Sequence, residues 1–434
     1  MKKLFFLWNK LTATFWFIPC LIILGSILLS MILVDIDSIT NFSNEGIKRS
    51  FFVNSSDSAR SILVTIAAAM MGVAGTVFSV TLVALTLASS QFGPRLIKNF
   101  MYVRLNQVVL GAYVSTYLYC LLVLNAVKDR EDFTFIPSLS ILVAIVAAIG
   151  NIVLIIIFIH RIAISIQADK IISDIADFMA KQVERLFPMQ IGQESAKDNA
   201  YEIEKIKTKY AYSTPIKSMK SGYLQYIDGD SLIKQIVKID GVLVIDFRPG
   251  KFLVAGMEMG KMYSNVLIEE KDLNKMIKQF VIGKTKMAQQ DLEYSIHQMV
   301  EVAVRALSPG VNDPFTAIVC IDNLSAILCQ LAQINLPSRY RCDAHENLRV
   351  VVDTFNFEGI VDASFNQIRQ FSSASPAVMI RLMEALLRIN EFAQTETHKK
   401  VINKHARMVL NLGKETIIEP NDLKDLIARS RKIL

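Results

Sequence analysis

Four long stretches of this chain contain no charged residue, and all of them lie before residue 160. They cover residues 11–34, 61–94, 107–127 and 133–159. A helix needs about 20 mostly apolar residues to cross a bilayer, and each stretch is long enough. We therefore predict an α-helical membrane domain at residues 1–160, with four helices at about residues 11–34, 61–90, 107–127 and 137–160. The rest of the chain is polar in pattern and is expected to lie on one side of the membrane.

The composition agrees with a membrane domain followed by a polar region. It also limits the kinds of partner that the chain is expected to bind. The chain has 434 residues, 52% of them hydrophobic, and a formal net charge of +7. The apolar excess lies in the first third, so it indicates membrane spans and a bilayer partner. We find no basic stripe interleaved with aromatic residues, so binding to nucleic acid is not predicted. The cysteines show no CxxC spacing and no neighbouring histidine pair, so we expect free thiols and no metal site. They are Cys20, Cys120, Cys320, Cys329 and Cys342.

The loops between the apolar stretches predict the orientation in the membrane. The segments before the first stretch, between the second and third, and after the fourth are basic, whereas the loop between the first and second is mixed in charge. Loops rich in lysine and arginine face the cytoplasm. Both termini and the polar region are therefore predicted to be cytoplasmic. The basic residues are Lys2, Lys3, Lys10, Arg95, Lys98, Arg104, Lys170, Lys181 and Arg185.

One face of the second apolar stretch consists almost entirely of small or hydroxyl side chains. Its members are spaced by three or four residues, which is the period of an α-helix. Small residues let helices approach closely and hydroxyls can bond across such a contact, so helix packing explains the face. A water-filled path explains it as well, because the face runs the whole length of the span. The predicted pore-lining residues are Ser61, Thr65, Ala68, Gly72, Thr76, Ser79, Val83, Thr86 and Ser90.

The residues inside this span and at its C-terminal end indicate which kind of transport the span could support. An ion-coupled transporter usually needs an ionisable group inside the membrane, and none occurs in the four stretches. A passive pore has no such requirement. Gly93 and Pro94 are expected to stop the helix near the inner interface. Gln91, Arg95 and Lys98 would then form an inner mouth, although anchoring to lipid headgroups explains them equally well.

The region after the spans is predicted to be α+β. Residues 161–211 are read as a juxtamembrane helix, continuous with the fourth span, and a linker. Residues 212–270 are read as a small β-rich subdomain in which Asp230 caps a short helix. Its strand and turn pattern resembles half of a barrel-sandwich domain of the biotinyl or lipoyl type, but no lysine stands in a matching tight turn, so no cofactor is predicted. Residues 271–434 are read as a helical subdomain.

A Ser-Pro-Gly turn at residues 308–310 is surrounded by polar residues. They could form a cytoplasmic site for a small ligand, but helix capping and turn formation explain two of them, with Asp313 as N-cap and Pro314 at the first helical position. The members of this possible site are Arg305, Asn312, Asp313 and Asp322. Nearby, Glu293, His297 and Glu301 share a helix face, which we interpret as a solvated stripe with a local ion pair and not a metal site.

Motifs of catalysis are missing. The sequence contains no Walker loop, no G-x-G-x-x-G and no G-x-S-x-G elbow, so an ATP-driven pump or a hydrolase is not predicted. We expect the protein not to be an enzyme.

Several longer motifs resemble a bacterial family of predicted membrane proteins, domain of unknown function 2254. They are TLVALTLASSQFGPR at residues 81–95, QDLEYSIHQ at 290–298, RALSPGVNDPFTA at 305–317 and DASFNQIRQ at 362–370. The resemblance covers essentially the whole chain. It implies a protein of the bacterial inner membrane with a cytoplasmic domain, and it implies no established activity.

Three classes of function remain, of which a membrane-bound enzyme is disfavoured by the missing catalytic motifs. The first is a homo-oligomeric channel or pore in which the second spans line the path and the cytoplasmic region regulates it. The second is a membrane-anchored scaffold or sensor whose spans only pack together. The long small-residue face favours the channel. The sequence does not identify a ligand of the cytoplasmic region.

Overall fold

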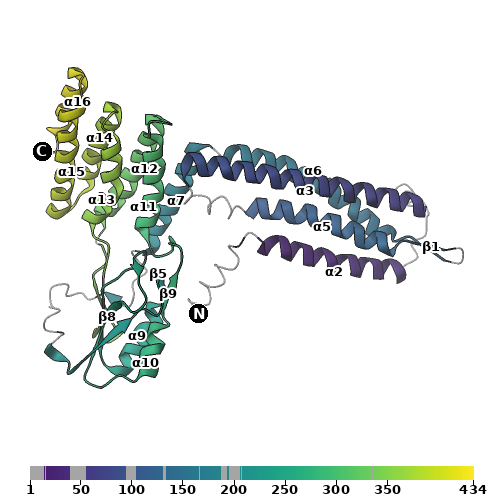
Figure 1. Ribbon diagram of the computed structural model, residues 1–434, viewed down its shortest axis with the longest axis horizontal. Coiled ribbons are helices and arrows are strands. Elements are labelled where there is room, and N and C mark those ends of the chain that lie inside the picture. The colour runs from purple at the N-terminus through teal and green to yellow at the C-terminus, as the bar shows by residue number, and fades with distance from the viewer. Residues whose placement is uncertain are drawn as a thin grey trace. The chain divides into compact units, whose positions relative to one another are not determined.

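The computed structural model describes residues 14, 16–39, 55–93, 104–130, 133–165, 167–186, 193–194, 206, 208–334 and 336–434. The chain folds as two compact units, Met1–Lys170 and Ile171–Leu434. The first is a bundle of long helices, and the second combines sheets with a layer of helices (Figure 1). This agrees with the predicted order of a helical apolar region followed by an α+β region.

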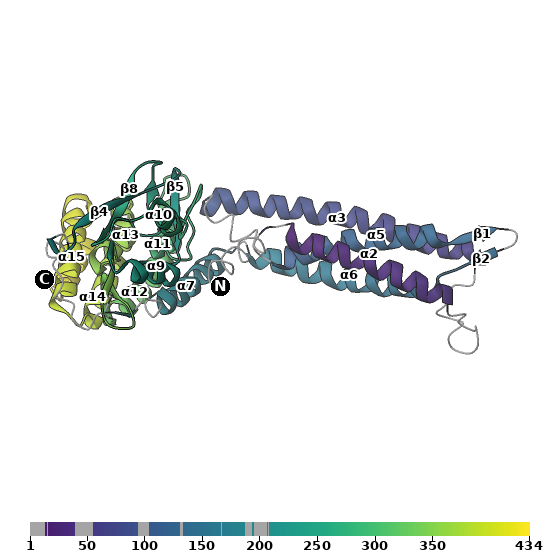
Figure 2. The same cartoon turned by 90° about the horizontal axis from the view of Figure 1, so that it is seen from below.

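The bundle consists of α2 (Phe17–Ile39), α3 (Ser56–Phe92), α5 (Arg104–Ala126) and α6 (Ser138–Ser165). Each overlaps most of one of the four uncharged stretches and is long and apolar enough to cross a membrane. α5 packs against the other three helices, and half of its apolar window is buried. A short hairpin, β1 (Lys128–Arg130) and β2 (Phe133–Phe135), joins α5 to α6 at one end of the bundle (Figure 2).

Close contacts and buried polar side chains hold the bundle together. Gly111 of α5 lies against α2, where a β-carbon would come within 3.0 Å of the Pro19 Cα. Asn151 of α6 donates from Nδ2 to the Thr116 Oγ1 on α5 at 2.9 Å. The interhelical hydrogen bond expected of an asparagine inside a span is therefore present.

The end of α2 differs from the prediction, because the helix continues past residue 34. Its last turns include Asp37, which is buried. The backbone N–H of Leu139 donates to Asp37 Oδ1 at 3.0 Å, and the N–H and hydroxyl of Ser140 donate to Oδ2 at 2.9 and 2.7 Å. Asp37 thus caps the first turn of α6 from a neighbouring helix, where a negative charge is stabilised by the helix dipole.

The predicted continuous helix across the junction of the two units is wrong. α6 ends at Ser165, Gln167 is not helical, and α7 (Ala168–Leu186) begins as a separate helix. α7 buries its apolar face on the second unit, where the Gln182 side chain donates to the Ala288 carbonyl and accepts from the Ser295 hydroxyl at 2.8 Å. It therefore belongs to the fold of the second unit.

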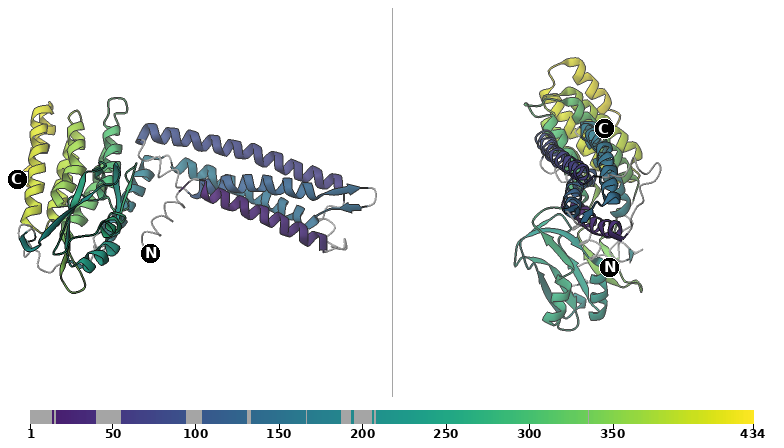
Figure 3. Two further views of the ribbon diagram at one scale, coloured as in Figure 1. Left: turned by 60° about the horizontal axis from the view of Figure 1, so that its bottom comes forward. Right: turned by 90° about the vertical axis from the view of Figure 1, so that its right-hand side faces the viewer.

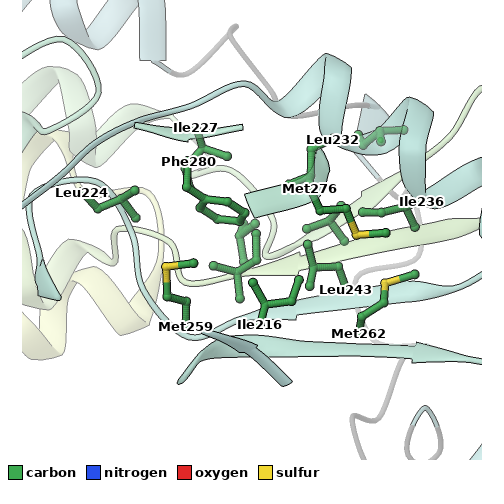
Figure 4. Packing of buried hydrophobic residues seen from close by; sticks show 14 of the residues in the cluster. Ile216, Leu224, Ile227, Leu232, Ile236, Leu243, Met259, Met262, Met276 and Phe280 are labelled. Carbon is green, nitrogen blue, oxygen red and sulfur yellow. The ribbon is translucent and has the colours of Figure 1, made fainter. Parts of the chain in front are cut away.

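Two open sheets form the β part of the second unit. The larger has the order β3 (Gln193–Glu194), β10 (Tyr340–Cys342), β11 (Leu348–Val352), β6 (Val242–Ile245), β8 (Glu258–Ser264) and β4 (Tyr212–Lys217). The smaller has the order β7 (Phe252–Leu253), β5 (Gly222–Ile227) and β9 (Phe280–Gly283). α9 (Gly229–Ile239) and α10 (Glu270–Ile277) complete this part. An apolar core joins the two sheets to both helices, with Leu243, Met259 and Phe280 among its members (Figure 4).

Three details of the predicted β-rich subdomain need correction. The described strands do not close a barrel. β9, β10 and β11 come from the segment that was expected to be helical, and β11 pairs in parallel with β6 at the centre of the larger sheet. The N-cap of α9 is Asp228 and not Asp230, because the Asp228 carboxylate accepts from the Ser231 N–H at 3.3 Å.

The remaining helices stand side by side, as Figure 3 shows at the yellow-green end of the chain. They are α11 (Leu292–Ala306), α12 (Pro314–Gln333), α13 (Phe357–Phe371), α14 (Pro376–Phe392), α15 (Glu396–Thr416) and α16 (Pro420–Ser430). α12 is a fifth helix that is long and apolar enough to cross a membrane by length and composition. It packs against α11 and α14, and 56% of its apolar window is buried.

Candidate functional site

α3 has one face that packs into the bundle. This face is formed by apolar residues at helical spacing and lies against α5 and α6. Alanines supply much of it, so the helix backbones approach closely. The buried residues of this face include Ala59, Leu63, Ala67, Met70, Ala74, Val77, Ala84 and Ala88.

The small-residue face predicted from the sequence points the other way. All nine of its members, from Ser61 to Ser90, are exposed. At Gly72 an added β-carbon would meet nothing within 4 Å. The face therefore does not serve helix packing within the described part of this chain. It is available to lipid, water or another protein surface.

The hydroxyl groups on this face bond to their own helix. Thr65, Thr76, Ser79 and Thr86 each donate to the carbonyl four residues earlier, at 2.7, 3.3, 2.9 and 2.9 Å. Such bonds satisfy a hydroxyl proton without a partner on another helix. These hydroxyl protons are therefore satisfied whether lipid or water covers the face.

The outward faces of α2 and α6 are different. They present large aliphatic side chains, such as Leu21 and Leu24 on α2 and Ile152 and Ile156 on α6, all more than half exposed. Side chains of this kind are typical of a lipid-facing surface. α3 also exposes large residues beside its stripe, including Met71 and Phe78. A continuous outward line of small and hydroxyl residues is nevertheless found on α3.

The proposed inner mouth lies mostly beyond what the structure describes. Gln91 is exposed in the last turn of α3. Gly93 follows the helix with φ of 111°, a conformation that favours glycine, and its N–H donates to the Ser89 carbonyl at 3.2 Å. The predicted helix stop is confirmed at this residue. Arg95 and Lys98 lie outside the described residues.

The polar residues near the Ser-Pro-Gly turn have separate roles. Asp313 is the N-cap of α12 and accepts from the Thr316 N–H at 3.1 Å and the Thr316 hydroxyl at 2.6 Å. These bonds, led by the one from the hydroxyl, lower the pKa of Asp313. Asn312 has φ of 49°, as expected for a turn residue. Capping and turn formation thus account for both residues, as predicted.

The other two members of this possible site pair elsewhere. Arg305 Nε lies 3.7 Å from Glu301 on its own helix. Asp322 faces α14, where Arg381 and Arg388 approach its carboxylate at 3.6 and 3.8 Å. Glu293, which shares a helix face with His297 and Glu301, forms an ion pair with Arg248.

Replacing Asp313 with alanine should cost about 1 kcal/mol of stability through the lost cap. Hydrogen exchange of the first turn of α12 should accelerate, and Asp313→Asn, which preserves a capping acceptor, should restore protection. If Asp313→Ala leaves this exchange unchanged yet abolishes an activity of the protein, the turn is a ligand site and capping is not its main role.

One cluster in the second unit was not predicted from the sequence. Arg248 pairs with Glu293 and with Asp353 at 3.3 Å, and its guanidinium lies 4.7 Å from the Phe355 ring. Asp291, the N-cap of α11, is buried beside it. An added β-carbon at Gly250, whose φ is 97°, would meet the Asp291 carboxylate. The sequence indicates only a turn at residues 248–251, and the partners are 40 or more residues away.

Comparisons with known proteins identify relatives without a known activity. The model of a family described as "Predicted membrane protein (DUF2254)" matches residues 12–388. An uncharacterized protein of Mycobacterium bovis is 27% identical over 381 residues, which is 87% of this chain and 72% of the relative. An uncharacterized protein of Mycobacterium tuberculosis matches with the same identity and coverage. No solved structure matches.

Proposed function

The chain belongs to the family of predicted membrane proteins known as DUF2254, and we propose that it is a homo-oligomeric channel or pore. The second span, α3, lines the path with its small-residue face. The second unit regulates the path, and the protein is not an enzyme. The observation that supports this proposal is the outward position of all nine stripe residues, which exposes the face to other copies around a common axis.

We further propose that four helices span the membrane and that α12 does not. α12 is packed among helices of the second unit, and its Asp322 pairs with two arginines of α14. An even number of spans and the basic loops then put both termini and the second unit in the cytoplasm of a bacterial cell, with the bundle in its inner membrane.

The length of α3 fits such an arrangement. Its 37 residues extend over about 55 Å at 1.5 Å per residue, whereas the hydrocarbon core of a bilayer is about 30 Å thick. The helix therefore reaches beyond the core. Its last residues before Gly93 include Ser89, Ser90 and Gln91, which suit an aqueous or headgroup region.

A substitution at Gly72 tests the proposal without disturbing the packing of one chain. Gly72→Leu adds a bulky side chain where a β-carbon has no neighbour within 4 Å, and Gly25→Leu on α2 is a matched control with the same open surroundings. We expect Gly72→Leu to reduce ion flux into reconstituted vesicles at least tenfold, because a large apolar ring would dewet the path. Gly25→Leu should leave flux unchanged.

Water access gives a second test. Single cysteines at Gly72, Thr76 and Ser79, in a background lacking Cys20 and Cys120, should react with water-soluble thiol reagents, because the thiolate needs water. Cysteines at Val77, which is buried, and at Ile152, on the aliphatic face of α6, should be protected. Native mass spectrometry in detergent should detect an oligomer.

Two results would refute the channel. A monomer at all concentrations, with no flux, would exclude a shared path. An oligomer that is lost in Gly72→Leu, with protected cysteines and no flux, would show that the face only packs against another copy. The protein would then be a membrane-anchored scaffold or sensor.

A further inference from the structure

Three segments far apart in the sequence meet at one end of the smaller sheet. We name the segments 217–221, 251–257 and 284–286 the basic tip. The Ser218 N–H donates to the Met257 carbonyl at 2.8 Å, and the Gly256 N–H donates to the Ser218 carbonyl at 2.8 Å. The third segment follows β9, whose Gly283 is paired with Tyr223 of β5.

The charge of the basic tip is entirely positive. The three segments contain five lysines and no acidic residue. Four of the lysines are exposed, and the fifth, Lys286, lies over the Tyr223 ring at 5.7 Å. The next acidic residue along the chain, Glu258, is already paired with Lys261 at 3.5 Å. The lysines are Lys217, Lys220, Lys251, Lys284 and Lys286.

Apolar side chains stand between these lysines. Met219 is 66% exposed, Val254 is 52% exposed and Phe252 is 53% exposed, with the Phe252 ring edge-on to Tyr223 at 5.1 Å between centroids. An exposed apolar group inside a basic surface is typical of proteins that bind at a membrane interface. Nucleic acid would use the lysines but has little use for exposed methionine and valine.

From this arrangement we propose that the basic tip binds the surface of an anionic lipid bilayer, with Met219 and Val254 inserted among the lipids and the lysines at the headgroups. Each lysine near an anionic membrane strengthens binding about fivefold. The unit is tethered to helices long and apolar enough to cross a bilayer. Lipid is therefore present at high effective concentration, and weak contacts suffice. This inference does not depend on channel activity.

The full-length protein in lipid nanodiscs provides the test. A fluorophore sensitive to its surroundings is attached at Met219→Cys in a Cys20→Ser background, since the other four cysteines are buried. The matched control is Ile418→Cys in the same unit, a position that is 96% exposed and lies between α15 and α16. The nanodiscs contain phosphatidylcholine alone or with about 30% phosphatidylglycerol, an amount chosen to give an anionic surface, and lipids with brominated chains act as quenchers.

We expect blue-shifted emission and quenching by brominated chains at position 219 in the anionic nanodiscs, and neither at position 418. The triple variant Lys220→Gln, Lys251→Gln, Lys284→Gln should weaken binding of the basic tip to the anionic bilayer about a hundredfold, and added salt should act in the same direction. These substitutions are on the surface, and an unchanged thermal unfolding curve would show that the fold is intact.

Three outcomes would overturn the inference. The first is equal emission at positions 219 and 418 in anionic nanodiscs. The second is quenching at 219 that does not depend on lipid charge or on the three lysines. The third is an emission change at 219 caused by an added RNA oligonucleotide in nanodiscs of phosphatidylcholine, together with no response to anionic lipid, which would identify a nucleic acid surface instead.

Discussion

Replacing Asp37 with alanine is expected to lower the stability of the first unit by about 3 kcal/mol. The carboxylate is buried and accepts three hydrogen bonds from Leu139 and Ser140 at the start of α6. Alanine would leave two backbone N–H groups of α6 without an acceptor and would remove a negative charge from the positive end of the helix dipole.

Unfolding of the full chain in mixed micelles of increasing denaturing detergent measures this effect. Asp35→Ala is the matched control, because Asp35 is an exposed acid in the same turn of α2. Asp37→Asn should give an intermediate loss, since an amide oxygen can accept from one N–H. Equal stability of Asp37→Ala and Asp35→Ala would show that α6 finds another cap.

The second large effect is a pH dependence of stability that comes from Asp291. This side chain is 1% exposed and caps α11 by accepting from the Tyr294 N–H at 3.1 Å. Burial raises the pKa of Asp291 to about 6, against the opposing influence of the Tyr294 N–H and of Lys286. Glu293 adds to the rise and Arg248 opposes it.

The sign of the effect follows from this shift. A carboxyl whose pKa is higher in the folded state binds its proton more tightly there. Its contribution to stability is complete below about pH 4 and is lost as the pH rises through about 6. Asp291→Asn should keep the cap but carry no charge. At pH 4 the variant and the natural protein should differ little in this respect. As the pH rises to 7.5, the free energy of unfolding of the variant should increase by about 3 kcal/mol relative to that of the natural protein.

Hydrogen exchange with mass spectrometry can localise the gain. Peptides covering the 248–253 turn and the first turn of α11 should be better protected in Asp291→Asn than in the natural protein at pH 7.5, after correction for intrinsic exchange rates. The difference should disappear near pH 4. A gain that is independent of pH would mean that the aspartate is not the titrating group.

The sequence predicted the apolar helices well, because lack of charge over 20 residues is a local property. It also predicted which side chains share a face of α3, since helical spacing decides this. It could not predict that this face is turned outward, because small residues suit both close packing and an open surface. The buried alanines of the opposite face, such as Ala67 and Ala74, show the ambiguity directly.

Features that depend on distant contacts were missed for a related reason. β11 joins the centre of the larger sheet about 105 residues after β6, and its short run LRVVV lies in a region whose pattern predicts helices. The capping role of Asp37 cannot be read from its neighbours in the sequence, because its partners lie about 100 residues away. The lysines of the basic tip come from three segments, none of which is strongly basic alone.

The hydroxyl groups of α3 have a consequence for the ion selectivity of the proposed channel. Thr65, Ser79 and Thr86 direct their protons to their own backbone. What these side chains offer outward is oxygen lone pairs, so they act as acceptors and not as donors. A ring of such oxygens solvates a cation and gives an anion nothing to bind. A path lined by this face should therefore conduct potassium or sodium in preference to chloride, and reversal potentials under a salt gradient would reveal that preference.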